Sequence, residues 1–150
     1  MNTPRSQRLQ RVADIAGKRT DEAATALAER LRNLDAARRR LQELQQFRRD
    51  YQVLPDGRRD SGTSVSELLN RQSFIARIDT AIAQQQCEVA ERTRQFAQAR
   101  TAWLASRCRS AALDTVTQRY RSREQASLER AEQAAIDDRM QYRKAPRRPS

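Results

Sequence analysis

Histidine is absent from this 150-residue chain, and glycine, cysteine and aromatic residues are scarce. The lack of His removes the commonest general base and metal ligand. With only three Gly, the chain has no glycine-rich loop to hold a phosphate. Cys87 and Cys108 would lie roughly 30 Å apart on one helix, so they can neither share a zinc ion nor form a disulfide with each other. We therefore expect no enzymatic activity, no cofactor and no metal.

The chain also lacks any long hydrophobic run. We therefore expect no signal peptide and no transmembrane helix, and a protein that stays in the cytoplasm unless a partner carries it. Hydrophobic residues make up 37% of the chain, charged residues 33% and aromatic residues 5%. Such a composition suits long helices that bury a stripe, and it cannot build a wide globular core.

Charge of one sign is in excess, because the chain carries a formal net charge of +11. The excess is +4 over residues 1–57, +4 over 58–112 and +3 over 113–150. A basic rod could attract nucleic acid, anionic lipid or an acidic protein surface. The even spread, with Asp and Glu interleaved, is more typical of the solvated faces of helices. We interpret the run Arg38 to Arg40 as such a face.

The strongest pattern in the chain starts at Ile75. Every seventh residue from there is apolar: Ile75, Ile82, Val89, Phe96, Trp103. The positions three further on are mixed: Ile78, Gln85, Arg92, Ala99. This alternation of three and four residues is the seam of a coiled coil, which needs a partner helix. An ordinary amphipathic helix on a globular core is the alternative interpretation.

Residues that stop one helix and start another predict that the chain folds back once. Pro55 and Gly57 stop a first helix, in which the apolar spacing slips between Leu34 and Leu44. Ser64 and Glu67 match a capping box that starts a second helix. The expected boundaries within a single domain are a helix over about 6–54, a loop over 55–63, a helix over about 64–142 and a disordered tail over 146–150.

Two helices with one short connection predict an all-α, antiparallel coiled-coil hairpin. If the fold-back centres near residue 60, the residue numbers of two facing residues should add up to about 120. Phe47 then meets Phe74, Trp103 lies beside Gly17, and Leu9 lies near residue 111. The longer second helix should protrude from about residue 113, with an apolar stripe that docks into another protein. A frayed helix without a partner is the alternative.

The stretch from Leu41 to Tyr51, a loop of about a dozen residues, and the stretch from Phe74 to Ile82 resemble the flagellar export protein FliJ family. The late Trp103 and the long second helix fit that family as well. Arg40 and Gln85 depart from the pattern, since relatives carry Gln and His there. The resemblance implies an antiparallel coiled coil, similar to the rotor stalk of rotary ATPases, that is a cytoplasmic protein peripheral to the inner membrane.

The resemblance also implies partners. The terminal end would bind the hexameric ring of the export ATPase, the loop-proximal half would bind the membrane export gate protein, and substrate-specific export chaperones are further partners. The residues carried over to gate binding are Leu44, Phe47, Tyr51, Phe74, Ile78 and Ala81. The residues expected to bind the ATPase are Leu9, Arg11, Leu113, Val116, Arg119, Tyr120, Arg121, Arg123 and Leu128.

Other interpretations stay open at this stage. Phe47, Phe74 and Ile78 could instead fill the seam between the two helices. The same architecture would serve the stalk of a virulence-type secretion system, which the sequence does not separate from a flagellar one. A basic coiled coil that coats nucleic acid is a third hypothesis, with Tyr120 among arginines as its only hint. We expect no specific nucleic-acid partner.

Overall fold

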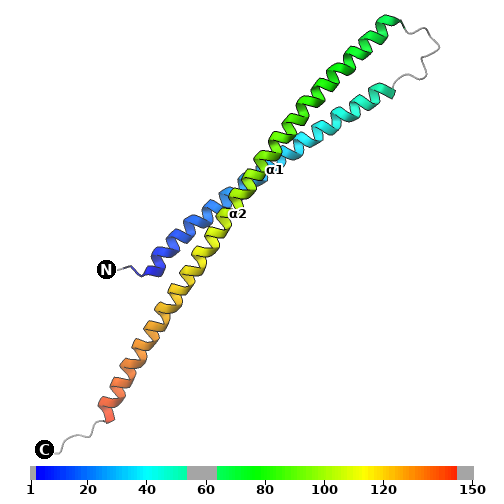
Figure 1. The fold of residues 1–150 in the computed structure, drawn as a ribbon. Helices are drawn as coiled ribbons and strands as arrows, with labels where there is room; N and C mark the ends of the chain where they lie inside the picture. The colour runs from blue at the N-terminus through cyan, green and yellow to red at the C-terminus, as the bar shows by residue number, and fades with distance from the viewer. Residues whose placement is uncertain (1–2, 54–63, 145–150) are drawn as a thin grey trace, which may run out of the picture. The chain divides into compact units, whose positions relative to one another are not determined.

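The computed structural model describes residues 3–53 and 64–144, which form two helices. Helix α1 covers Arg5–Val53 and helix α2 covers Val65–Lys144 (Figure 1). The described residues contain no strand, so the all-α hairpin is confirmed, and α2 is the longer helix with 80 residues against 49. The whole expected loop, 55–63, and the whole expected tail, 146–150, lie outside the described residues.

Helix α2 begins where the capping signal predicts. The side-chain oxygen of Ser64 accepts a hydrogen bond from the backbone N–H of Glu67 at 3.2 Å. The carbonyl of Ser64 also accepts from the N–H groups of Glu67 and Leu68. Ser64 is therefore the N-cap, and it satisfies donors that the first turn leaves without a partner inside the helix.

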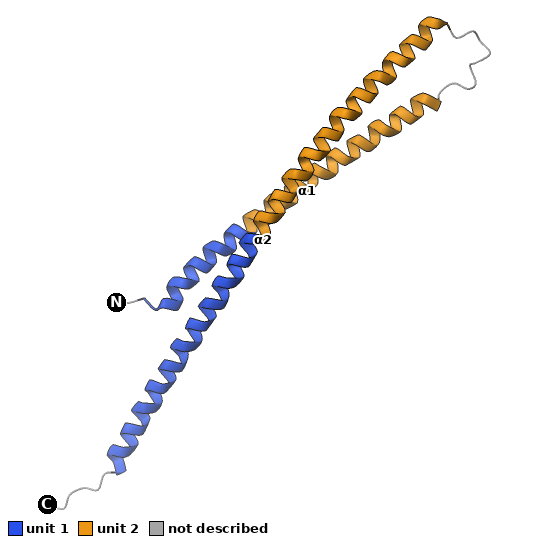
Figure 2. Cartoon of the chain, in the orientation of Figure 1, with its two compact units in different colours: residues 1–20, 105–150 blue, residues 21–104 orange. Residues whose placement is uncertain are grey.

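The hairpin divides into two compact units, each containing a part of both helices (Figure 2). Unit 1 consists of residues 1–20 and 105–150, and unit 2 of residues 21–104. Each unit pairs α1 with α2 in antiparallel fashion, and the two differ in what fills the seam.

In unit 2 the seam is built as the heptad pattern predicts. Every α2 position of the two series from Ile75 to Trp103 is buried or half-buried. On α1, Leu34 and Ala37 are 2% and 7% exposed and are followed at the same spacing by half-buried Leu41 and Leu44. The predicted slip in this region is therefore wrong. Ala37 keeps the seam in register, because a small side chain fills the position where the sequence pattern has no large one.

Leu34 offers a direct test of this packing. We expect Leu34→Ala to lower the free energy of unfolding by about 3 kcal/mol, because a fully buried leucine leaves a cavity that a two-helix seam fills only in part. Leu31, one turn earlier and 42% exposed, is the matched control. Leu31→Ala should cost less than about 1 kcal/mol. Urea denaturation followed by circular dichroism measures both, and equal losses would contradict the proposed seam.

In unit 1 the most buried positions of the seam are small and polar residues. On α1 it contains Ser6, Ala13 and Ala16, all less than a tenth exposed. On α2, Thr117 is 3% exposed, and its hydroxyl donates to the carbonyl of Leu113 at 2.7 Å. The 3-4 spacing thus continues through polar residues. The sequence pattern alone indicates a coiled coil that fades in this region, because Ser and Thr do not count as apolar in a heptad pattern. A hydroxyl that donates to a carbonyl of its own helix can nevertheless be buried in a seam.

The register of unit 1 corrects the predicted pairing. Arg121 donates to Gln10 at 2.6 Å, and the backbone N–H of Ser6 donates to Glu124 at 3.2 Å. These pairs sum to about 130, so Leu9 does not meet residue 111. Near the loop the predicted sum of about 120 holds, since Phe47 and Phe74 do meet. Helix α1 therefore accompanies α2 as far as Glu124, about a dozen residues beyond the point expected.

The expected start of the protruding part of α2 changes with the register. The free part of α2, called the overhang below, comprises residues 125–144 and does not start at 113. Every residue of the overhang is exposed. A Cβ built on Gly17 meets nothing within 4 Å, so the packing around this position does not require a glycine.

Candidate binding surfaces

Three aromatic rings form the core of the loop-proximal surface in unit 2. The rings of Phe47 and Phe74 meet edge-on with centroids 6.1 Å apart, and Tyr51 lies 4.7 Å from Phe74. Phe47 is 50% exposed and Phe74 is 37% exposed. Both residues lie one position before a seam position. Their side chains therefore pack on each other and still expose one side of each ring to solvent. Such partly exposed aromatic clusters are typical anchors for a protein partner.

Arg71 fixes the end of α1 beside this cluster. Its guanidinium donates to the carbonyls of Tyr51 and Gln52, at 2.9 and 2.7 Å, and lies 5.9 Å from the centre of the Tyr51 ring. The last carbonyls of a helix have no partner within it, and a cation is favourable at that end. Arg71 thus caps α1 from the neighbouring helix and holds Tyr51 in place.

The other predicted gate residues divide into two groups. Ile78 is 6% exposed, so its side chain belongs to the hairpin seam and offers little surface to a partner. Leu44 and Ala81 are half-buried and line a groove of about 570 Å³. Arg40 and Gln85, the two positions that depart from the family pattern, line the same groove. Gln85 donates to the carbonyl of Ala37 at 3.0 Å, so this residue ties the two helices together.

Sequence reasoning missed three exposed aliphatic residues at the start of α2. Val65, Leu68 and Leu69 are 73%, 48% and 60% exposed. They precede Arg71, where the buried spacing of α2 begins, and the sequence interpretation used this segment only as a helix start. Their signal was available in the sequence, because Val65 and Leu69 lie outside the 3-4 spacing and Leu68, one heptad before Ile75, extends the apolar series towards the helix start.

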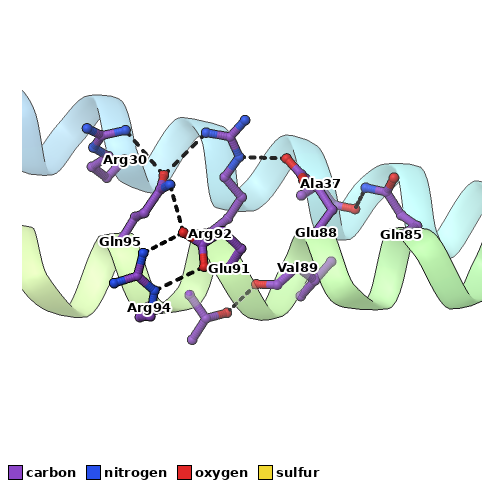
Figure 3. Close-up of polar contacts among 10 residues, drawn as sticks. Arg30, Ala37, Gln85, Glu88, Val89, Glu91, Arg92, Arg94 and Gln95 are labelled. Atoms are coloured by element: carbon purple, nitrogen blue, oxygen red, sulfur yellow. Dashed lines mark hydrogen bonds and ion pairs between the residues drawn. The ribbon is translucent and has the colours of Figure 1, made fainter.

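The polar network in the middle of unit 2 supports the fold and does not form a site (Figure 3). Arg92 donates to Glu88 at 2.8 Å and to Gln95 at 3.3 Å, and Arg30 reaches Gln95 from α1 at 3.2 Å. Hydrogen bonds from Arg94 lower the pKa of Glu91 to about 2. These are solvated ion pairs, which contribute little to stability.

The terminal surface in unit 1 surrounds Tyr120. The guanidinium carbons of Arg5 and Arg123 lie 5.2 and 5.6 Å from the centre of its ring, and the side chain is half-buried. Among the predicted ATPase-binding residues, Leu9 and Leu113 are half-buried in the seam. The exposed members of that set are Arg11, Val116, Arg119, Arg121, Arg123 and Leu128. Only Leu128, 61% exposed, lies on the overhang.

Ser6 and Glu124 close the hairpin at this end. The hydroxyl and the backbone N–H of Ser6 donate to the Glu124 carboxylate, and these bonds hold the pKa of Glu124 below its ordinary value of 4.5. The carboxylate therefore caps the first turn of α1 from the other helix, where a negative charge is favourable. Because the folded-state pKa is lowered, this contribution is present above the ordinary pKa and is lost as pH falls through the folded-state value.

We expect Ser6→Ala to raise the pKa of Glu124, since the larger of its two hydrogen bonds disappears. Carboxyl chemical shifts from NMR, followed as pH is lowered, measure this directly. The control is Glu91, which Arg94 holds at a pKa of about 2 in unit 2 and which should not respond. An unchanged Glu124 in Ser6→Ala would show that the serine hydroxyl does not reach the carboxylate in solution.

In the described part of the chain, no three His, Cys, Asp or Glu residues gather where a metal ion could bind. The two described helices also contain no segment apolar and long enough to cross a membrane. What the fold presents are flanks of a hairpin that carry exposed aromatic, aliphatic and arginine side chains.

An all-α, antiparallel helical hairpin is therefore the class of protein that the fold defines. Residues 5–148 match the family described as flagellar FliJ protein. The match covers nearly the whole chain, and the chain belongs to that family, which is a component of flagellar protein export. No curated protein matches the chain at a significant level.

Proposed function

We propose that this protein is the stalk of the flagellar export apparatus: its terminal end enters the ring of the export ATPase, and its loop-proximal half contacts the membrane export gate. The observation that carries the proposal is the overhang. Residues 125–144 are exposed throughout, and the hydrogen bonds of Gln125, Arg130 and Gln133 stay within α2. A single helix of this kind is marginal alone and gains stability by docking.

The terminal surface provides the chemistry for such docking. The overhang begins beside the cluster of Tyr120, Arg5 and Arg123 and carries Leu128 one turn later. An apolar anchor next to cations suits a ring lumen lined by apolar and acidic side chains. The protein would act by biasing ring assembly and gate state through contacts, in the cytoplasm at the face of the inner membrane.

The loop-proximal surface supports the second contact. Phe47 and Phe74 combine an open face with a fixed geometry, which lowers the entropy cost of binding. Val65, Leu68 and Leu69 add aliphatic area in the same unit. The gate would thus meet one side of unit 2, while Ile78 supports that side from the seam. Export chaperones are further partners that the family resemblance predicts.

The family match favours a flagellar apparatus over the virulence-type alternative. The nucleic-acid hypothesis loses its main hint, because two arginine side chains already lie over the Tyr120 ring that a base would need for stacking. The test is reconstitution with the export ATPase. Purified chain should bind the ATPase and raise its hydrolysis rate. Absence of both effects would refute the stalk assignment.

A further inference from the structure

Residues 5–20 of α1, called the arm below, lie on α2 across a seam that contains few large apolar side chains. The arm and the part of α2 beside it both belong to unit 1 (Figure 2). In the described seam only Leu9, Leu113 and Tyr120 are large side chains with much apolar surface, and all three are half-buried. The other seam positions are Ser6, Ala13, Ala16 and Thr20 on α1, and Ser106, Ser110, Thr117 and Glu124 on α2.

The seam of unit 2 is much richer in large apolar residues. Leu34 and Ile78 are 2% and 6% exposed there, and the series from Ile75 to Trp103 adds aliphatic and aromatic side chains. Burial of apolar surface is the main favourable term when helices pair. The arm should therefore be held less firmly than the rest of α1, because segments with few buried apolar contacts open locally before the whole molecule unfolds.

Polar contacts join the arm to α2 at both of its ends. Near its start, Ser6 donates to the Glu124 carboxylate through both its backbone N–H and its hydroxyl. Near its other end, the hydroxyl oxygens of Thr20 and Ser106 lie 3.1 Å apart within hydrogen-bond distance. Water can replace such bonds when the arm leaves α2, so they set its position but contribute only modestly to its stability.

The start of the arm has no cap of its own. The carbonyl of Pro4 accepts from the N–H groups of Gln7 and Arg8, so Pro4 occupies the N-cap position. A proline side chain has no oxygen that could accept from the first-turn N–H groups. The described first turn also contains no acidic residue, and it carries Arg5 and Arg8 at the helix end that disfavours cations. Glu124 supplies from α2 both the missing acceptor and the missing negative charge.

We propose that the arm is a latch: residues 5–20 detach from α2 and unwind as one unit while unit 2 stays paired, and Glu124 keeps the latch closed. An arm that leaves α2 loses its cap and its compensating charge together, so detachment and loss of helix are coupled. In the open state the single-helix part of α2 lengthens from residues 125–144 to 105–144. Opening also exposes Leu113, Thr117 and Tyr120, so the closed arm withholds this face of α2 from a partner.

Hydrogen exchange of the full chain, resolved by peptide, measures the latch with no partner present, so the outcome does not depend on the proposed stalk function. We expect the amides of residues 9–20 to exchange at least about tenfold faster than those of residues 27–44 in unit 2, and at least about tenfold slower than an unfolded chain. Glu124→Ala should speed exchange of the arm by roughly tenfold, because the acceptor and the charge disappear together. Residues 27–44 should keep their protection, which shows that the variant is folded.

Glu129→Ala is the matched control. Glu129 is an exposed carboxylate five residues later on α2, and the hydrogen bond that it accepts comes from Gln125 of the same helix at 3.2 Å. This variant should leave exchange of the arm unchanged. Pro4→Asp added to Glu124→Ala tests the coupling, because it places an acceptor and a negative charge at the N-cap itself. The double variant should slow exchange of the arm by about fivefold relative to Glu124→Ala.

Three results would overturn the proposal. The first is an arm that exchanges at the same rate as residues 27–44, because the hairpin would then open only as a whole. The second is an arm that exchanges as fast as an unfolded chain in the wild-type protein, because nothing would then be latched. The third is an equal effect of Glu124→Ala and Glu129→Ala, because the Glu124 carboxylate would then not hold the arm.

Discussion

A chain that ends at Glu124 is expected to fold as a hairpin and to lose all stimulation of the export ATPase. Folding should survive because α1 makes its last contacts with Glu124, and the side chains after it are exposed. We expect the free energy of unfolding to change by no more than about 1 kcal/mol. Stimulation should fall to the rate of the ATPase alone, since the segment proposed to enter the ring is gone.

The position of the cut decides what this experiment means. A chain cut at residue 112, as the sequence register would suggest, also removes Leu113, Thr117 and Tyr120 from the seam of unit 1. Loss of stimulation would then report unfolding as much as lost docking. The matched point variant is Leu128→Asp in the full chain, which should lower stimulation without changing helix content. Full stimulation by the chain that ends at Glu124 would move ring binding onto the hairpin itself.

The seam of unit 2 could be predicted from the sequence because its positions are marked by apolar residues. From Ile75 to Trp103 most seam positions are apolar, so the heptad count gave the correct face, and the contact between Phe47 and Phe74 followed from the fold-back point. The helix start at Ser64 was predictable for a similar reason, since the cap depends on local chemistry alone. Gly57 and Pro55 lie outside the described residues, so the loop they predict stays a prediction.

Unit 1 was not predictable in the same way. Its most buried seam positions are Ser, Ala and Thr, and a hydrophobicity pattern does not register Thr117 as a core residue although it is 3% exposed. The register also drifts between the two ends, from pairs that sum to about 120 near Phe47 to about 130 at Ser6. A fixed sum of 120 therefore placed the N-terminal start of α1 beside a point on α2 that is about a dozen residues too early. Polar hydrogen bonds between the two helices, such as that of Ser6 with Glu124, fix the register in unit 1. Which polar residues pair across the helices cannot be seen from the amino-acid composition.

The candidate sites divide along the same line. Residue type and spacing found Phe47, Tyr51 and Phe74, but only burial separates these open aromatic residues from Ile78, which the seam encloses.

The largest effect expected on the second partner comes from the aromatic pair. Phe47→Ala and Phe74→Ala should each weaken binding to the cytoplasmic part of the export gate by roughly 30-fold, as loss of a hot-spot side chain worth about 2 kcal/mol would do. The hairpin itself should lose little stability, because both rings lie outside the seam and Phe47 is half exposed. Isothermal titration calorimetry measures the affinity, and urea denaturation measures the stability.

The matched control is Leu31→Ala, an apolar residue that is 42% exposed in the same unit but is not part of the aromatic cluster. It should change gate affinity by less than about twofold, because exposed side chains outside an interface contribute little. Ile78→Ala tests a residue of the seam in place of the exposed aromatic pair. It should reduce stability through a cavity in the seam, and it should reduce gate binding only as far as Phe74, one turn earlier, loses its support. If Phe47→Ala and Phe74→Ala both bind the gate normally while Leu68→Ala and Leu69→Ala do not, the contact surface belongs to the first turns of α2 and not to the aromatic pair.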